Sequence, residues 1–499
     1  MSGTGQETQT NKPLAYRVPK SVQYYESNGS PVLILRLPLK AITIHPSWKY
    51  VFTHLSKGNF VTFENIVSLM QHADSEEIEI FLNGLVHKGF LEREGFPVLT
   101  NYPPVSIIIP VRNRPEEIAS CLQSLSQLDY PEEKIEVFVI DDASDDDTPA
   151  AVSKFPVNLI STKEHKQAPF CRNLAAREAT GEILAFLDSD CSADPLWFKE
   201  LIHAFRDPSL GAVGGVVDAF YNEKGLDRYE EVKSSLNMGH WFKSSREGDH
   251  FFYVPSCNLL VRRILFLRLG GFRDDMYVGE DVDFCWRLQD LGYHVEYWPV
   301  GRVFHKHRNR IWQFCTRRFD YGTSEPLLQQ AHEKRIKQFF LPPAETLFWV
   351  LIVLYIILKW IPLLGLCVIN ILIDSLFKFI RTRKKNIPIK FPRLLRATFR
   401  GYLAFYYHCC AFISRYYLIL AVLILPFVPL ASLIVFGMHF LTGLVEYFIN
   451  KPHLNFPLFV FYFSLDQLAY QSGVWWGCLK RLYFRPVNPQ LVSKIPLKE

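Results

Sequence analysis

The sequence predicts an α/β protein in three parts, and three observations support this. Short apolar strands alternate with helical segments over residues 104–325, a texture typical of a sheet covered by helices on both faces. A smaller pattern of strands and helices fills residues 29–98, and long apolar runs dominate residues 340–485. A chain of 499 residues also has the length of about three domains.

The composition excludes several classes of protein. Hydrophobic residues make up 49% of the chain and charged residues 21%, which excludes a disordered protein. The net charge of +5 is too small for a dedicated nucleic-acid binder, so we expect no nucleic-acid partner. The ten cysteines form no Cys-x-x-Cys pair and the polar N-terminus carries no secretory signal, so we expect reduced thiols in a cytoplasm and no zinc site.

The N-terminal part predicts a mobile tail followed by a small domain. Residues 1–28 are polar, and Val32–Leu35 and Ala41–Ile44 then have the pattern of two short strands. Three helical segments follow; the last starts at Ser75, a plausible N-cap, and ends before Gly89, which suits a left-handed C-terminal position. Two strands and three helices over residues 29–98 indicate a winged-helix-like domain.

The central part begins after a Pro-Pro linker and alternates strand, helix and strand. Val105–Pro110 and Ile135–Ile140 are almost continuously apolar, and Pro115–Leu128 between them has helical periodicity. Strands of this kind are buried on both faces, as in a parallel sheet covered by helices.

Acidic side chains in this domain come in three groups, two of which directly follow an apolar strand: Asp141-Asp142, Asp188-Ser189-Asp190 and Glu280-Asp281. Open α/β sheets bind ligands at the carboxyl ends of their strands, where carboxylates suit a divalent cation that holds phosphate oxygens. Any one group alone is equally typical of a turn or a helix start. Their order and spacing within one α/β unit favour a metal-dependent site for a phosphate-containing substrate.

The last third contains three apolar runs long enough to be membrane candidates: Leu347–Ile373, Leu418–Ile449 and Phe456–Leu479. Between the first two, residues 378–400 carry nine Lys and Arg and no acid, which favours the cytoplasmic side. A run with both ends on one side is too short to cross twice. We therefore expect bent, re-entrant or interfacial helices on the inner leaflet, kinked near Pro362 and Pro426; two single-pass helices are the alternative.

The central motifs resemble those of the inverting family-two glycosyltransferases, which implies a Rossmann-like GT-A domain for nucleotide-diphospho-sugars. The resemblance covers about residues 104–320. It rests on the strand and loop Ser106–Arg114, on Val139–Ser144, on Arg172-Asn173 with Gly181–Asp190, and on Gly270-Gly271-Phe272 with Gly279–Asp283. Gln313 precedes Arg317-Arg318-Phe319 near the place of the Q-x-x-R-W motif of processive relatives, but the spacing and the Phe depart from it, so processivity is not implied.

The resemblance implies a role for each matching residue. Asp281, with Glu280 beside it, is the catalytic base that removes the acceptor hydroxyl proton. Asp190, supported by Asp188, binds Mg²⁺ or Mn²⁺, and His305 is a candidate further ligand. Asp142, with Asp141 beside it, contacts uracil and ribose. The nucleotide-sugar set implied in full is Pro110, Arg112, Asn113, Arg114, Asp141, Asp142, Arg172, Asp188, Arg317 and Arg318.

The N-terminal part resembles the PqqD-like domains, which bind peptides by adding a strand to a sheet edge. Together with a family-two domain and a hydrophobic C-terminal region, it resembles transferases that build a β-linked oligoglucose chain from UDP-glucose on a peptide-derived redox cofactor. Nucleotide sugars are made in the cytosol, so we expect the cytoplasmic face of the cell membrane, with inner-leaflet lipids as partners.

Two alternatives stay open. One is a family-two transferase that builds a cell-surface polysaccharide or glycolipid on a lipid-linked acceptor. The other, of a different class, is a catalytically dead peptide-binding module. The intact set of Asp142, Asp190 and Asp281 argues against the second alternative.

Overall fold

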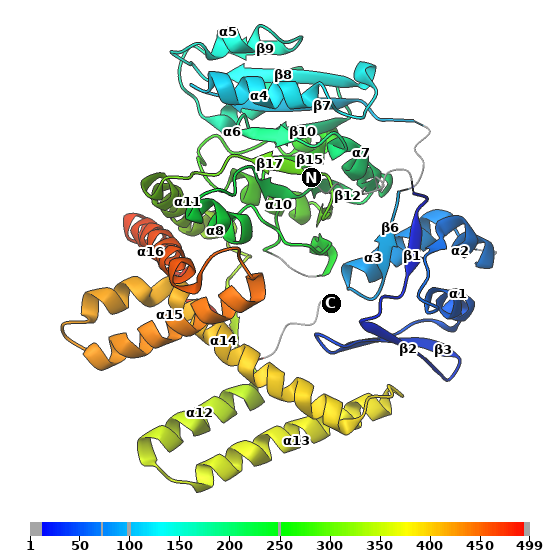
Figure 1. Ribbon diagram of the computed structural model, residues 1–499, viewed down its shortest axis with the longest axis vertical. Coiled ribbons are helices and arrows are strands. Elements are labelled where there is room, and N and C mark those ends of the chain that lie inside the picture. The colour runs from blue at the N-terminus through cyan, green and yellow to red at the C-terminus, as the bar shows by residue number, and fades with distance from the viewer. Residues whose placement is uncertain (1–11, 71–72, 97–100, 248–250, 494–499) are drawn as a thin grey trace. The chain divides into compact units, whose positions relative to one another are not determined.

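The computed structural model describes residues 12–70, 73–96, 101–247 and 251–493. The chain divides into two compact units, each built from segments far apart in the sequence (Figure 1). The sheet unit comprises Met1–Leu14, Glu94–Arg335 and Asn450–Tyr462. The helical unit comprises Ala15–Arg93, Ile336–Ile449 and Phe463–Glu499.

The sheet unit is built on a sheet of eight strands. Their spatial order is β14 (Lys243–Ser244), β16 (His294–Tyr297), β12 (Leu210–Gly214), β15 (Asn258–Arg262), β10 (Ile183–Leu187), β7 (Val105–Val111), β8 (Ile135–Asp141) and β9 (Asn158–Ser161). Strands β7 to β10 are parallel, but β15 runs antiparallel to β10 and β12, and β14 runs antiparallel to β16. The sheet is therefore mixed, whereas the apolar strands alone favoured a parallel one.

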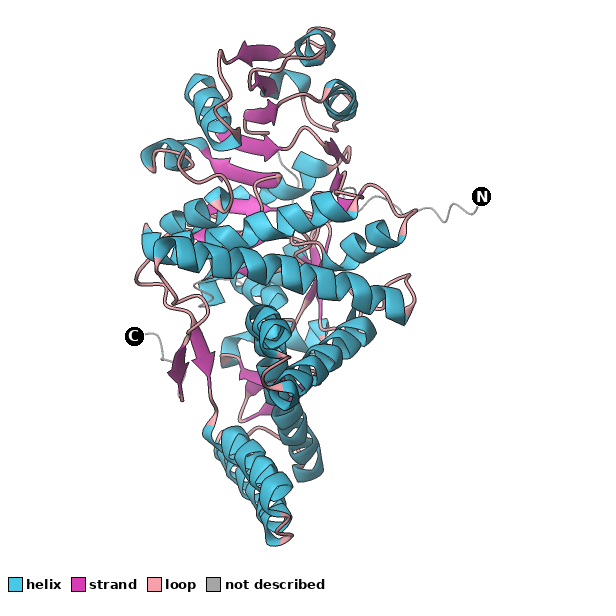
Figure 2. Ribbon diagram, turned by 90° about the vertical axis from the view of Figure 1, so that its left-hand side faces the viewer, coloured by secondary structure: helices cyan, strands magenta, loops and turns pink. Residues whose placement is uncertain are grey.

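Alternate residues of the central strands enter two different cores. Ile107 and Ile109 of β7 pack in one core with α4 (Pro115–Leu125), while Ile108 packs in the other with α6 (Ala168–Glu178). Helices lie on both sides of the sheet in Figure 2. The continuous apolar runs follow from this arrangement, because a strand buried on both faces has no side exposed to water.

A second sheet of three strands completes the unit beside the main one. It joins β11 (Cys191–Ala193), β17 (Val303–His305) and β13 (Val217–Ala219). The antiparallel pairing of β11 with β17 sets Cys191 opposite His305. The remaining helices of the unit are α5 (Thr148–Val152), α7 (Trp197–Leu201), α8 (Gly225–Lys233), α9 (Arg263–Arg268), α10 (Glu280–Asp290) and α11 (Ile311–Ala331).

The small N-terminal domain has more strands than the sequence indicated. The expected strands and helices are present as β3 (Ser30–Leu35), β4 (Lys40–Thr43), α1 (Lys49–Leu55), α2 (Phe63–Leu69) and α3 (Ser75–His87). They are joined by β1 (Ala15–Arg17), β2 (Val22–Ser27), β5 (Val61–Thr62) and β6 (Glu92–Glu94). The tail expected over residues 1–28 is thus wrong for its second half, since β2 pairs with β3; residues 1–11 lie outside the described part.

Two smaller details of this domain also differ. The N-cap of α3 is Asp74, whose carboxylate accepts the backbone N–H of Glu76, and Ser75 is the first helical residue. One face of the sheet β2-β3-β4 is covered by residues from the far end of the chain, because Val32 and Ile34 pack with Ile387 and Leu394.

The hydrophobic part of the helical unit consists mostly of long helices. They are α12 (Pro343–Leu358), α13 (Pro362–Lys384), α14 (Phe391–Ile424), α15 (Pro429–Asn450) and most of α16 (Phe456–Arg481); β18 (Gln338–Phe340) pairs with β19 (Gln490–Val492). The first run breaks at residues 359–361, just before Pro362, and the second at residues 425–428, which include Pro426; this confirms the two expected interruptions. Each run is therefore two helices joined by a short turn, as expected when a proline removes a backbone donor.

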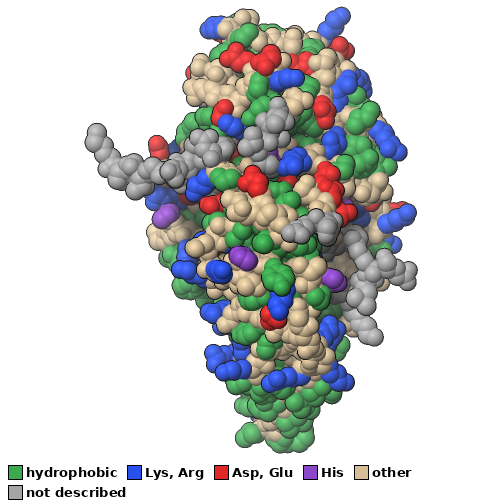
Figure 3. Space-filling model, turned by 90° about the vertical axis from the view of Figure 1, so that its right-hand side faces the viewer, with side chains coloured by type: hydrophobic (Ala, Val, Ile, Leu, Met, Phe, Trp, Pro, Cys, Tyr) green, Lys and Arg blue, Asp and Glu red, His purple; other side chains and the backbone are tan. Residues whose placement is uncertain are grey.

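Among the described residues, α13, α14 and α15 are long and apolar enough to cross a membrane, and α12 is a shorter apolar helix. Helix α16 is not among these three and buries Asp466, Gln467 and Gln471. Hydrophobic side chains cover the lower end of the molecule in Figure 3, where α12 and α13 lie in Figure 1, below a belt of Lys and Arg. These features support membrane association.

Candidate active site

The candidate site lies where the order of the parallel strands reverses. Strand β7 is flanked by β8 on one side and by β10 on the other. From β7 the chain first adds β8 and β9 towards one edge of the sheet and then adds β10 on the opposite side of β7. Arg114 follows β7, Asp141 ends β8, and Asp188 and Asp190 follow β10. A crevice forms at such a switch point because neighbouring loops leave in opposite directions, and ligands of open α/β sheets bind there.

Asp190 and His305 come together through the register of the small sheet. The pairing of Cys191 with His305 places the His305 Nε2 3.4 Å from Oδ1 of Asp190. Both side chains are largely buried, and neither Oδ1 of Asp190 nor Nδ1 of His305 has a hydrogen-bond partner in the described chain. Unsatisfied buried polar atoms are costly, which makes this pair a suitable place for a cation.

Cations surround the other oxygen of Asp190. Its Oδ2 lies 2.7 Å from Nη1 of Arg114 and 3.7 Å from Nη1 of Arg308. Burial alone raises the pKa of this carboxyl group, but His305, Arg114 and Arg308 together outweigh it and lower the pKa to about 2. Asp190 is therefore ionised throughout the physiological range, as a metal ligand must be.

The donor set fits a hard or borderline divalent cation. Asp190, Cys191 and His305 each offer one ligand atom, all within 4.8 Å of one another. Burial raises the pKa of Cys191 well above its usual value, so its thiol stays protonated and is a poor ligand. A carboxylate and an imidazole remain, which suit Mn²⁺ or Mg²⁺ completed by substrate phosphate oxygens.

Arg172 is buried and connects two acidic groups. Its Nη2 lies 2.5 Å from Oδ1 of Asp188, and its Nη1 lies 2.9 Å from Oε1 of Glu280. Only 3% of the Arg172 side chain is exposed, which leaves little of it for a nucleotide. The expected nucleotide-binding residue thus holds the Asp188 loop and the Glu280-Asp281 turn together.

Glu280 and Asp281 open helix α10, where Gly279 takes a left-handed conformation with φ of +88°. Asp281 is half-buried; its Oδ2 accepts the backbone N–H of Ser256 and its Oδ1 that of Val282. Burial and the charge of Asp281, partly offset by Arg172, raise the pKa of Glu280 to about 7, and burial also raises the pKa of Asp281. A carboxylate pair with raised pKa values is suited to taking a proton near neutral pH.

Asp283, only two residues further on, has a structural role. It accepts a hydrogen bond from Nε of Arg287 at 2.7 Å and lies 2.9 Å from Nε2 of His332. Its side chain is 1% exposed, so no substrate reaches it.

The loops after β7 and β8 are tied to each other. The backbone N–H of Asn113 donates to Ser144 Oγ, that of Arg114 donates to Thr148 Oγ1, and that of Asp145 donates to Asn113 Oδ1. Arg112 and Asn113 are exposed and Arg114 is half-buried, whereas Pro110 is buried within β7. Of the four residues expected here, Arg114 contacts Asp190, Arg112 and Asn113 lie in the loop after β7, and Pro110 lies within that strand.

The two adjacent acids at the end of β8 differ in their surroundings. Oδ2 of Asp142 accepts the backbone N–H of Gln167 at 2.8 Å and lies 2.7 Å from Nδ1 of His165, while its Oδ1 accepts the backbone N–H of Lys166 at 2.7 Å. Asp141 accepts only the backbone N–H of Ser144 on Oδ1, and its Oδ2 has no partner among the described residues. Asp142 therefore anchors the loop that leads into α6, whereas Asp141, which is also buried, keeps one oxygen without a protein partner among the described residues.

Arg317 and Arg318, both expected to bind the nucleotide, also differ. Arg318 is buried and donates to Oε1 of Glu230 at 2.6 Å and to Ser235 Oγ at 2.9 Å. Arg317 is half-buried, with its guanidinium over the rings of Tyr321 and Tyr277 at 4.8 and 6.0 Å. Of the two, only Arg317 has a guanidinium that makes no ion pair with the residues that the structure describes.

The structure adds residues that sequence reasoning did not single out. Arg308 faces Asp190, and its only signal in the sequence is its place among Lys306, Arg308 and Arg310 just after His305. Ser256 holds Asp281, and no local pattern marks it.

The chain is similar to several known proteins. Residues 106–269 match the model of glycosyl transferase family 2. The pre-mycofactocin glycosyltransferase of Mycobacterium tuberculosis is 26% identical over 400 residues, covering 78% of this chain and 82% of that protein. The glycosyltransferase AglE of Haloferax volcanii is 31% identical over 202 residues, covering 39% and 64%. Among solved structures, the mannosyltransferase PcManGT of Pyrobaculum calidifontis, in complex with GDP-Man and Mn²⁺, is 22% identical with a TM-score of 0.39, covering 61% of this chain and 86% of that one.

The family match spans the strands that carry Arg114, Asp141 and Asp190, and the mixed α/β sheet has the GT-A architecture that the sequence indicated. Residues 106–269 are thus similar to the glycosyl transferase family 2 model, and over most of its length the chain is similar to pre-mycofactocin glycosyltransferase.

Proposed function

We propose that this protein transfers a sugar from a nucleotide-diphospho-sugar to an acceptor hydroxyl with inversion at the anomeric carbon. The observation that carries the proposal is the link through Arg172, which holds the Asp188–Asp190 loop and the Glu280-Asp281 turn in one site. A transferase needs a group that stabilises the departing diphosphate and a base for the acceptor hydroxyl side by side, because the bond to phosphate breaks as the bond to the acceptor forms.

In this proposal Asp281 is the base. Its half-buried carboxylate is oriented by the backbone N–H groups of Ser256 and Val282, and it takes the acceptor hydroxyl proton as the oxygen attacks the anomeric carbon. The bond between that carbon and the phosphate oxygen breaks in the same displacement, so an α-linked donor gives a β-linked product. Glu280 stays paired with Arg172 and keeps the turn in place.

Asp190 and His305 would hold Mg²⁺ or Mn²⁺. The cation, when bound, supplies positive charge that stabilises the departing nucleoside diphosphate. Asp141, the exposed residues Arg112 and Asn113 and the half-buried Arg114 would orient the nucleotide, and Arg317 is available for its diphosphate.

We further propose UDP-glucose as donor and premycofactocin as acceptor, extended to a β-linked oligoglucose chain. The support is the similarity to pre-mycofactocin glycosyltransferase over 78% of this chain. We place the enzyme on the cytoplasmic face of the cell membrane, because Arg381, Arg383 and Lys384 cluster at the end of α13. A peptide partner would add as a strand to the exposed edge strand β4 of the small domain.

The test is the mass of the product. Detergent-solubilised protein is incubated with UDP-glucose, Mn²⁺ or Mg²⁺ and an extract that contains premycofactocin. A ladder spaced by one hexose on the small redox molecule supports donor, acceptor and chain growth together. UDP release without such a ladder, together with a sugar-containing product that extracts into organic solvent, would instead support a lipid-linked acceptor. The apolar helices α13, α14 and α15 are the observation that keeps this second candidate open.

A further inference from the structure

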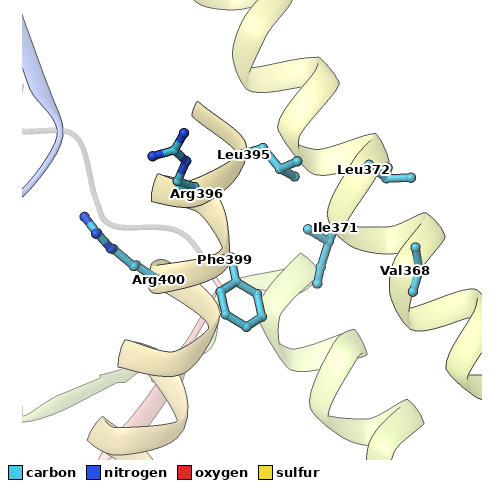
Figure 4. A pocket seen from close by; sticks show the side chains of 7 residues that line it. All are labelled: Val368, Ile371, Leu372, Leu395, Arg396, Phe399 and Arg400. Carbon is cyan, nitrogen blue, oxygen red and sulfur yellow. The ribbon is translucent and has the colours of Figure 1, made fainter. Parts of the chain in front are cut away.

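Helices α13 and α14 enclose a groove outside the candidate active site. It has a volume of about 510 Å³ and is lined by Val368, Ile371, Leu372, Leu395, Arg396, Phe399 and Arg400. In Figure 4, Ile371, Leu395 and Phe399 lie between the two helices, and both arginines are on the side of α14 that turns away from α13. The volume is in the range of small-molecule sites, and the lining is almost wholly apolar, with the two guanidinium groups at its border on α14.

The arginines of the groove have no partner of their own. Arg396 and Arg400 are exposed, one helical turn apart, and neither makes a hydrogen bond or ion pair in the described chain. The nearby acids, Asp374 and Glu345, are instead paired with Lys378, at 2.7 and 3.6 Å. Residues 381–400 contain no acid, so no residue of this segment compensates the positive charge beside the groove.

We infer that this groove binds one anionic phospholipid. An acyl chain would cover the apolar lining, and the two guanidinium groups would hold the phosphate, whose oxygens match their paired donors. Basic pockets between membrane helices bind acidic headgroups, and long arginine side chains reach up to the level of the headgroups. A free phosphate ion would leave the apolar lining uncovered, and the choline of phosphatidylcholine would bring a positive charge close to the two guanidinium groups.

The proposal rests on the membrane association proposed above, but its test needs neither a bilayer nor sugar transfer. The full chain is purified in a nonionic detergent, incubated with phosphatidylglycerol, washed at high salt and analysed by native mass spectrometry. High salt screens diffuse attraction between exposed charges. We expect one retained phosphatidylglycerol, no retained phosphatidylcholine, and no displacement by inorganic phosphate.

Paired variants separate the groove from the surrounding charge. R396Q with R400Q removes the two groove charges, and R381Q with K384Q removes two exposed charges outside the groove. We expect the first pair to lose the retained lipid and the second pair to keep it. Loss in both pairs, retention in both, or displacement by inorganic phosphate overturns the proposal.

A second pair tests the acyl chain. Val368 lines the groove and its neighbour Ile369 does not, although the two side chains are similarly exposed, at 58% and 51%. V368W is expected to raise the lipid concentration for half occupancy at least about tenfold, and I369W to leave it unchanged. Equal effects of the two tryptophans would contradict a chain bound in this groove.

Discussion

Arg172 donates a hydrogen bond to Glu280 over a distance of 2.9 Å, although the two residues are 108 positions apart in the chain. The other amino group of the same guanidinium donates to Asp188. The donor side and the acceptor side of the candidate site are thus joined by one buried side chain. Removing one partner of a buried ion pair is costly because it leaves an uncompensated charge.

Arg172→Met is therefore expected to lower the free energy of unfolding by about 3–5 kcal/mol and to abolish transfer. Adding Glu280→Gln should recover part of the stability, because the second substitution removes one of the stranded charges. Denaturant unfolding of the two single variants and the double variant measures this coupling. Purely additive effects would mean that the pair is not coupled. Arg172→Lys is the control that keeps the charge but not the two-pronged geometry.

Asp281→Asn is expected to slow transfer about 10²- to 10⁴-fold, the usual contribution of a general base, and to leave UDP binding intact. Rates from a UDP-release assay and UDP affinity from calorimetry check the two parts. Asp275→Asn, at a carboxylate that is 65% exposed, is the control and should keep wild-type rates. An Asp281→Asn enzyme with wild-type rates would exclude Asp281 as the base.

Glu280 makes stability depend on pH. Its pKa is about 7 in the folded chain and about 4.5 when unfolded, so between these values the folded state binds more protons. The contribution of Glu280 to stability therefore falls as pH rises, by about 3 kcal/mol in all, and is fully lost only once pH is well above 7. Thermal unfolding from pH 4.5 to 8 checks the slope, which Glu280→Gln should reduce. An unchanged slope in that variant would assign the pH dependence to another group.

If Asp190 and His305 hold the cation, substituting either residue should change how transfer depends on the Mn²⁺ concentration. His305→Gln should raise the Mn²⁺ concentration for half-maximal transfer about tenfold or more, and Asp190→Ala should abolish metal-dependent activity. Titration of Mn²⁺ into metal-stripped protein, followed by activity and by calorimetry, measures both effects. Full activity of Asp190→Ala in the presence of a chelator would contradict the metal role.

The two acids at the end of β8 are expected to act differently. Asp142→Asn removes acceptor capacity from the loop at residues 165–167, so hydrogen exchange there should become faster and the donor KM should rise with it. Asp141→Asn should raise the donor KM without changing exchange in that loop. Hydrogen–deuterium exchange mass spectrometry beside initial-rate kinetics tests this, and equal exchange in the two variants would remove the distinction.

The sequence by itself determined the strands of the central domain and the order of its acidic groups. A strand buried on both faces must be apolar at successive positions, as Val105–Val111 is. Such a run is a local pattern, so the sequence alone reveals it. The breaks near Pro362 and Pro426 were predictable for the same reason, because a proline interrupts its own helix. The expectation of a mobile tail over residues 1–28 was wrong for β2, because this strand has mostly polar side chains and is stabilised by its pairing with β3.

Only the tertiary structure decided which side chains meet. His305 reaches Asp190 through the antiparallel register of β11 and β17. Asp142, unlike Asp141, is held by residues 165–167, which come 23 to 25 positions after it and fold back onto it. Arg172 had the pattern of a nucleotide ligand and is instead committed to Asp188 and Glu280. Periodicity records how much of a residue is buried, whereas the partner of a charged group is set by strand register and long-range packing, which no local pattern encodes.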